Sequence, residues 1–145
     1  MIERLDSVTA ATTLVSTRIY AVNPPQKPTT PYLRVQRISS PHEQHLRGPH
    51  YPAAYRFQVD SCAAESDGGD PLGVVQALAA AVIGNGLGPE ASGLFGWIGT
   101  LGGSPMTIAV SNVELLHAGE PEFFPDELRM MRVRMDFLFY WSPLG

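Results

Sequence analysis

Histidines gather in one stretch of this sequence, and imidazole nitrogens are common zinc ligands. His42, His45 and His50 all fall between residues 39 and 54. Their spacing matches no recognised ligand pattern, and the stretch contains no cysteine to complete a site. We therefore expect no metal here, and we interpret His42 and His45, with the neighbouring Arg47, as residues that contact solvent or a partner protein.

A cysteine and a glycine run also have possible chemistries. Cys62 could act as a nucleophile, but no nucleophile elbow or known cysteine signature surrounds it. The run Gly84–Gly88 follows a predicted helix and not a strand, so it lacks the context of a phosphate-binding loop. Acidic pairs such as Asp67 with Asp70 stand in loops without catalytic partners. We predict no catalytic residue and no cofactor site, and we expect a protein that is not an enzyme.

Arginines offer the clearest candidate surface. Residues 32–38, 55–60 and 129–141 alternate polar and apolar side chains with the period of two of a half-buried strand. If the apolar residues face a core, the opposite face gathers Arg34, Arg56, Arg132 and Arg134 with Asp60 and Asp136. Such a face can be ordinary solvent surface, since many sheets expose one polar side. The alternative is a subunit interface or a channel lining, because guanidinium groups suit ion pairs and phosphate contacts.

The strands that position these arginines follow from the same patterns. Residues 31–62 predict a hairpin with a long loop at 39–54, and residues 129–141 predict a strand in the centre of the sheet. Residues 106–117 predict a strand whose alternation slips near 111–113, as at a β-bulge. Residues 18–20 predict a short edge strand at most, because two adjacent prolines follow soon after.

Two helices are expected beside these strands. Residues 2–13 place apolar side chains at roughly helical spacing, with acids early, where they complement the helix dipole. Asp70 and Pro71 suit the N-cap and first position of a second helix, which Gly84 ends. The apolar stripe expected on the sheet is Leu72, Val75, Leu78, Ala79 and Val82. The predicted fold is α+β, with two helices on one face of a largely antiparallel four-stranded or mixed sheet.

A second long loop is expected at residues 84–105, where glycines alternate with bulky apolar side chains. Phe95 and Trp97 are unfavourable to leave in water, since aromatic side chains bury large areas. We expect them to pack either in the subunit's own core or against a neighbouring subunit or partner. In the second case the loop becomes ordered on assembly.

Composition is typical of one small domain. The chain has 145 residues, 44% of them hydrophobic, and a formal net charge of −4. We expect a single domain over residues 1–145 and no partnership with a membrane. One cysteine excludes an intrachain disulfide and indicates a reducing compartment. No run has the length of a membrane span and the first residues lack an apolar signal core, so we expect assembly in a cytoplasm.

Several stretches form a recognisable series along the chain. They are Arg18-Ile19-Tyr20, Pro31–Ser39, Leu46-Arg47-Gly48, Tyr55–Asp60 and the helix that follows. In this order they resemble the small tail-completion proteins of long-tailed bacteriophages, a family often catalogued only as a domain of unknown function and similar to the lambda-type tail terminator. The resemblance covers residues 5–84, and residues 62–64 depart from it by lacking an aromatic side chain.

The resemblance implies a non-enzymatic virion assembly protein. Relatives form a sixfold ring that caps the growing tail tube, stops polymerisation of the tube protein and presents a surface to the head connector or stopper protein. DNA crosses the lumen of that ring during ejection. The implied location is the head–tail junction of a virion, after assembly in the bacterial host cytoplasm. A head-completion connector ring and, more distantly, a small enzyme of unknown reaction stay open as alternatives.

Overall fold

The computed structural model describes residues 1–39, 44–45, 48–49, 53–65, 70–103, 106–124 and 127–144. The helices are α1 (Ile2–Asp6), α2 (Thr9–Val15), α3 (Pro71–Ile83) and the short 3₁₀ helix η1 (Gly88–Glu90). The strands are β1 (Ile19–Ala21), β2 (Tyr32–Ser39), β3 (Gln44–His45), β4 (Gly48–Pro49), β5 (Ala53–Ala64), β6 (Gly99–Gly103), β7 (Met106–Ala118), β8 (Glu122–Phe124) and β9 (Glu127–Leu144). No helix in these ranges is long and apolar enough to cross a membrane.

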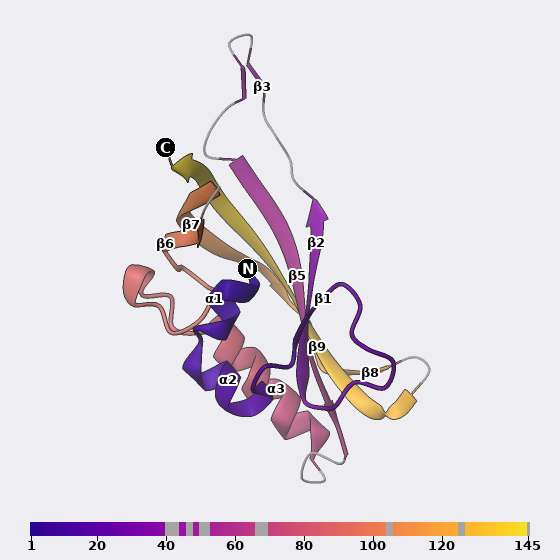
Figure 1. Ribbon diagram of the computed structural model, residues 1–145. Coiled ribbons are helices and arrows are strands. Elements are labelled where there is room, and N and C mark those ends of the chain that lie inside the picture. The colour runs from indigo at the N-terminus through magenta and orange to yellow at the C-terminus, as the bar shows by residue number, and fades with distance from the viewer. Residues whose placement is uncertain are drawn as a thin grey trace.

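Seven strands within the described residues form one mixed sheet, in the order β1-β2-β5-β9-β7-β6, with β8 paired to β9 (Figure 1). β1 runs parallel to β2, and the remaining pairs are antiparallel. The predicted hairpin is β2 with β5, and β9 lies centrally as predicted. The predicted four-stranded sheet is wrong, because β1, β6 and β8 also join it. β3 and β4 pair separately, within the segment expected as a long loop.

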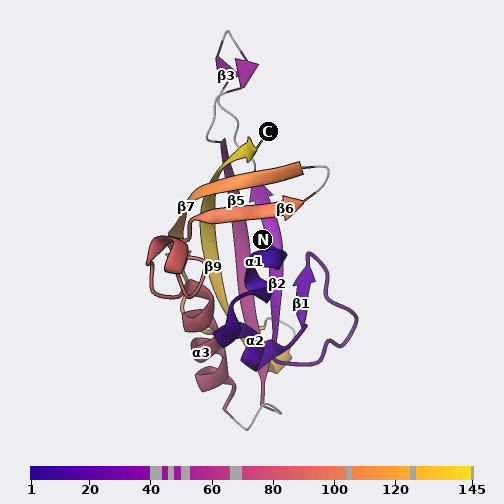
Figure 2. The same cartoon turned by 60° about the vertical axis from the view of Figure 1, so that its left-hand side comes forward.

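β1 is the short edge strand predicted at residues 18–20, whereas β6 and β8 were not predicted, because they lack alternation. β6 has the sequence Gly-Thr-Leu-Gly-Gly, and its pairing with β7 comes from tertiary contact and not from a β-rich composition. The predicted bulge is confirmed, since the register of β7 against β9 shifts between Val110 and Asn112. A bulge bends its strand. Figure 2 shows β6 and the adjoining part of β7 lying across β2, β5 and β9, so the sheet is curled and not flat.

In the part of the chain that the structure describes, three α-helices lie on one face of the sheet, so the expectation of two is wrong. Residues 2–13 divide into α1 and α2 at Ser7, whose hydroxyl donates a hydrogen bond to the Arg4 carbonyl at 2.6 Å. Such a local bond competes with continuation of the helix. The caps predicted for α3 are confirmed: the Gly73 N–H donates to Asp70 Oδ1 at 3.0 Å, and Gly84, with φ +76°, follows the last turn.

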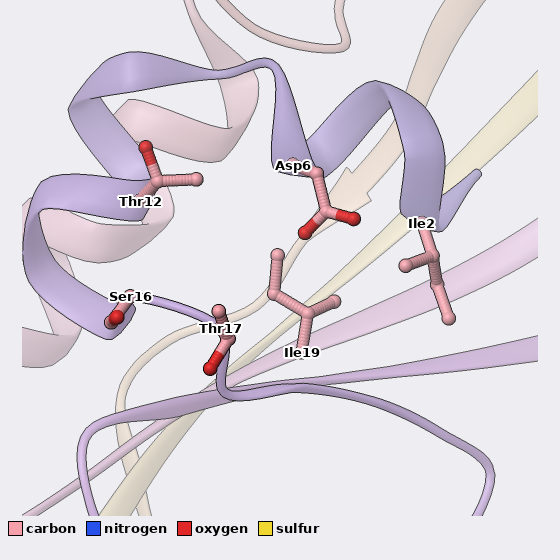
Figure 3. A pocket seen from close by; sticks show the side chains of 6 residues that line it. All are labelled: Ile2, Asp6, Thr12, Ser16, Thr17 and Ile19. Atoms are coloured by element: carbon pink, nitrogen blue, oxygen red, sulfur yellow. The ribbon is translucent and has the colours of Figure 1, made fainter.

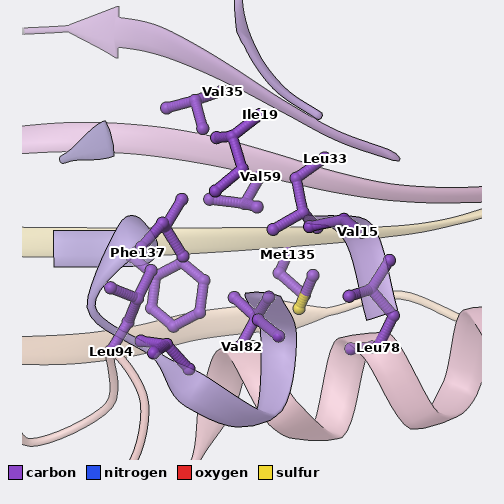
Figure 4. Packing of buried hydrophobic residues seen from close by; sticks show 14 of the residues in the cluster. Val15, Ile19, Leu33, Val35, Val59, Leu78, Val82, Leu94, Met135 and Phe137 are labelled. Carbon is purple, nitrogen blue, oxygen red and sulfur yellow. The ribbon is translucent and has the colours of Figure 1, made fainter. Parts of the chain in front are cut away.

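The core lies between the helices and the concave face of the sheet. Figure 4 shows its centre, which contains Val15, Ile19, Leu33, Val35, Val59, Leu78, Val82, Leu94, Met135 and Phe137. Alternate positions of β2, β5 and β9 supply the sheet side, as the period of two predicted. α3 packs against β5 and β9 through most of its predicted stripe, but Leu72 is 43% exposed and lies outside it. The opposite face of the same three strands is left for polar side chains.

Candidate functional site

The arginine surface predicted from the sequence lies on the face of the sheet opposite the helices. Register places Arg34 of β2 opposite Asp60 of β5, and Asp60 opposite Arg134 of β9. Directly opposed residues in antiparallel strands have Cβ atoms about 4.5–5.5 Å apart. One carboxylate therefore stands between two guanidinium groups on a row across three strands.

Asp60 is the centre of this row. Arg34 Nε donates to Asp60 Oδ2 at 3.1 Å, and Arg134 Nε lies 3.6 Å from Asp60 Oδ1. Gln58 Nε2 donates to the same Oδ1 at 3.1 Å. The Asp60 side chain is only 2% exposed, whereas Arg34 is 26% and Arg134 41% exposed. The nearly buried acid is thus paired with two arginines that stay partly exposed.

A second ion pair extends the row along β5 and β9. Arg56 Nη2 donates to Asp136 Oδ2 at 2.9 Å. Arg56 is 44% exposed, while Asp136 is 12% exposed. The same arrangement recurs, with a nearly buried acid holding a half-exposed arginine.

The fourth predicted arginine lies apart from this exposed group. Arg132 Nε donates to Glu122 Oε1 of β8 at 2.7 Å, and its guanidinium lies 5.2 Å from the centre of the Phe124 ring. β8 covers Arg132, which is 14% exposed. The four arginines carry four positive charges, and their partners Asp60, Asp136 and Glu122 carry three negative charges, so one positive charge is in excess. The structure therefore makes the face nearly charge-balanced, with Arg34, Arg56 and Arg134 as its accessible cations.

The other residues predicted to contact a partner differ in where they lie. His42 and Arg47 lie outside the described residues, and of His45 only the backbone is described, in β3. Phe95 is 41% exposed and Trp97 is 7% exposed. Trp97 packs in the subunit's own core, with the Arg4 guanidinium 4.7 Å from its ring centre. Of the two aromatic residues, Phe95 alone presents a large accessible surface.

A hollow between α1, α2 and β1 was not predicted. It has a volume of about 500 Å³ and is lined by Ile2, Asp6, Thr12, Ser16, Thr17 and Ile19 (Figure 3). Sequence reasoning could not find it, because the six side chains come from α1, α2, β1 and the turn between α2 and β1, and they form no motif. One carboxylate, three hydroxyls and two isoleucines make a mixed surface that fits a side chain or a short segment better than it fits catalysis.

Comparison with known proteins gives the context for this geometry. The sequence model of the tail completion protein gp17 family matches residues 1–96. The chain belongs to the tail completion protein gp17 family. The match includes Arg34, Arg56 and Asp60, and it ends before β6. The resemblance to phage tail-completion proteins, inferred above from short stretches, is confirmed.

Solved structures extend the likeness of this tail completion protein over its whole fold. A chain of the virion of a native gene transfer agent particle is similar with a TM-score of 0.57 and 13% identity, over 97% of this chain and 93% of the other. A second solved structure has a TM-score of 0.53 and 16% identity, over 98% and 92% of the two chains. These likenesses show a shared fold that includes β6 to β9. No curated protein matches the sequence significantly.

Cys62 of this tail completion protein lies in surroundings that do not suit reactive chemistry. Burial raises the pKa of the Cys62 thiol to about 12, next to Tyr32, whose pKa burial also raises. A thiol with so high a pKa is protonated at neutral pH and is a poor nucleophile. Within the described part of the chain, no group of three or more His, Cys, Asp or Glu side chains could hold a metal ion.

Proposed function

We propose that this tail completion protein is a tail terminator. In this proposal it forms a ring, sixfold as the resemblance to tail terminators implies, at the head-proximal end of a phage-like tail tube. There it stops polymerisation of the tube protein and joins the tail to the head connector or stopper protein. It is assembled in the bacterial host cytoplasm and stays at the head–tail junction of the virion. The family match carries this proposal, and the fold shared with a gene transfer agent virion chain supports it.

In this ring the arginine face lines the channel through which DNA passes. Its accessible guanidinium groups, on Arg34, Arg56 and Arg134, retain N–H donors suited to phosphate oxygens. Affinity for DNA grows with the number of phosphates that cations neutralise. Asp60 and Asp136 offset most of the positive charge of the three arginines, so the face attracts DNA only weakly. The DNA can therefore pass through the channel without being held. A channel needs this property more than it needs tight binding.

Tube growth in vitro tests the terminator role. Purified protein is added to polymerising tube protein, and tube lengths are measured by electron microscopy. A terminator yields short tubes with a ring at one end, with a length distribution that depends on when the protein is added. Unchanged tube lengths, with binding to the connector instead, would support a head-completion protein and refute the terminator role.

Substitution of the accessible arginines tests the channel lining. Charge reversal is unsuitable, because a glutamate at 56 or 134 would face Asp136 or Asp60 across the sheet. The double variant Arg56→Gln/Arg134→Gln keeps a donor to each acid and removes two charges. We expect normal capping of tubes but slower DNA ejection from the particles. Arg37→Gln removes one positive charge from the opposite face of β2, where the Arg37 guanidinium lies 5.7 Å from the Tyr55 ring centre, and it is the control for the single variants Arg56→Gln and Arg134→Gln. Ejection rates that are the same for these three single variants would contradict the channel role.

A further inference from the structure

The hollow of Figure 3 contains a carboxylate that has no partner among the residues that the structure describes. Asp6, the last residue of α1, lines the hollow and is exposed. It forms no hydrogen bond or ion pair within the described residues. Arg4, on the same helix, is directed elsewhere, because its Nη2 donates to the carbonyls of Ala91 at 2.6 Å and Gly93 at 2.9 Å. The charge of Asp6 is therefore left uncompensated.

The next arginine along the chain is also occupied. Arg18 Nε donates to the Pro31 carbonyl at 2.8 Å, and Arg18 Nη2 donates to the Leu14 carbonyl at 3.2 Å. These bonds hold the turn between α2 and β1, where Ser16 has a φ of +54°. The two arginines nearest to Asp6 in the sequence thus stabilise the fold, and neither neutralises Asp6. The walls of the hollow are fixed in the free subunit, so a ligand meets a preformed site.

The floor of the hollow is apolar, although several of its lining residues have hydroxyl groups. Ile19 of β1 and Ile2 of α1 contribute aliphatic side chains. The Thr12 hydroxyl donates to the Thr9 carbonyl at 3.2 Å, so it is turned to the backbone of its own helix. Figure 3 shows the Thr12 methyl group directed into the hollow and the Asp6 carboxylate facing Ile19. The hollow therefore presents one negative charge beside a surface of methyl groups.

This combination selects the class of occupant. Asp6 would repel an anion, and a neutral side chain would displace water from the carboxylate without replacing its hydrogen bonds. A cation with an aliphatic stem suits both parts, because long basic side chains pack their methylene groups on apolar surface and keep the charge in polar surroundings. Lysine fits better than arginine, since one carboxylate suits a compact ammonium, whereas a guanidinium has five donors in a fixed plane. The volume of about 500 Å³ accommodates the stem of a lysine.

We propose that the hollow binds a lysine side chain of another protein in the particle, with the ammonium paired to Asp6 and the stem packed on Ile2 and Ile19. The occupant comes from a different protein because this sequence contains a single lysine, Lys27, which borders a separate hollow beside Tyr32. This inference rests on the proposed function, which gives this tail completion protein the tube protein and the head connector as neighbours. It assigns the residues that recognise one of these neighbours.

One ion pair contributes little to affinity and more to orientation. Partly exposed pairs are screened by water and salt, and charge pairs across an interface mainly fix the register and speed association. We therefore expect the loss of the Asp6 charge to weaken binding to the partner about fivefold at low salt, the upper end of the usual range for an exposed pair. The effect should shrink as the salt concentration rises.

Carbodiimide cross-linking tests this contact with the full chain, on tubes that it caps and that are joined to the connector. The reagent activates a carboxylate, a neighbouring lysine amine attacks it, and an amide forms while the reagent leaves as a urea. Trypsin then cleaves after Arg4 and Arg18, and Asp6 is the only acidic residue in the released peptide 5–18. A cross-link to this peptide therefore identifies Asp6. We expect mass spectrometry to find the peptide joined to a lysine of the tube protein or the connector, and to find no such product with Asp6→Asn.

Binding to the cross-linked partner measures the size of the effect. Asp6→Asn should raise the protein concentration needed for half-maximal binding about fivefold at low salt. Glu90→Gln is the matched control, since it removes the same charge from an exposed acid in η1 and should leave this concentration unchanged. Asp6 is exposed, so the melting temperature of Asp6→Asn should match that of the original chain. Equal weakening by both variants would show a general charge effect and overturn the proposal.

The cross-linking outcomes separate the lysine site from the terminator role. Short, capped tubes without any cross-link through Asp6 would overturn the proposal and leave the terminator role intact. A cross-link between Asp6 and Lys27 of a second copy would identify a subunit contact and likewise overturn the proposal. Tubes of unchanged length, together with a cross-link from Asp6 to the connector, would support the lysine site and remove the terminator role.

Discussion

Asp60 gives the sharpest prediction about how the arginine face is held. Replacing Asp60 with Asn keeps the shape of the side chain and an oxygen that accepts from Gln58, but it removes the negative charge between Arg34 and Arg134. Arg34 belongs to β2 and Arg134 to β9, the two strands that flank β5, so neither side chain can move far to find another partner. We expect the folded state to be strongly destabilised.

The magnitude follows from burial. Breaking a buried ion pair by removing one partner costs about 3–5 kcal/mol. Asp60 is 2% exposed, but its partners are 26% and 41% exposed, so water screens part of the repulsion between them. We expect a loss of about 2–4 kcal/mol in the free energy of unfolding. Near 145 residues, about 3 kcal/mol corresponds to a fall of about 6–12 °C in melting temperature.

Asp136→Asn is the matched control, since it makes the same chemical change on the neighbouring strand. Its partner Arg56 is 44% exposed, so the loss should be about 1 kcal/mol or less. Urea denaturation followed by circular dichroism measures both variants. If Asp60→Asn loses no more than Asp136→Asn, Asp60 is not the residue that organises this face.

Two further predictions concern buried side chains. Because burial raises the pKa of Cys62 to about 12, the folded protein keeps a proton that the unfolded chain releases near pH 8.5–9, so stability should fall by about 1–2 kcal/mol between pH 8 and pH 10. Urea denaturation at both pH values checks this, and a Cys62→Ala variant with the same slope would contradict it. Trp97→Ala should cost about 3–5 kcal/mol through a core cavity and the lost contact with Arg4. Phe95→Ala should cost about 1 kcal/mol or less, and equal losses in thermal denaturation would show that Trp97 is not a core residue.

Local chemistry made several features of this protein predictable from sequence. The start and end of α3 depend on Asp70, Pro71 and Gly84, which act within one turn of the backbone. The alternation of β2, β5 and β9 identified the arginine face, because side-chain direction in a strand depends only on parity. The bulge in β7 was visible as a slip in that alternation. Family membership was also recognisable from short stretches.

Only the tertiary structure decided the features that depend on distant residues. β6 becomes a strand through pairing with β7, although its glycines carry no strand signal. Asp60 becomes nearly buried because β2 and β9 flank it on both sides. Phe95 and Trp97 have similar neighbours in the sequence, yet Arg4 and the core enclose Trp97, whereas Phe95 stays exposed. Parity and caps are properties of neighbouring residues, whereas burial is set by everything that packs around a side chain, and a linear pattern does not record it.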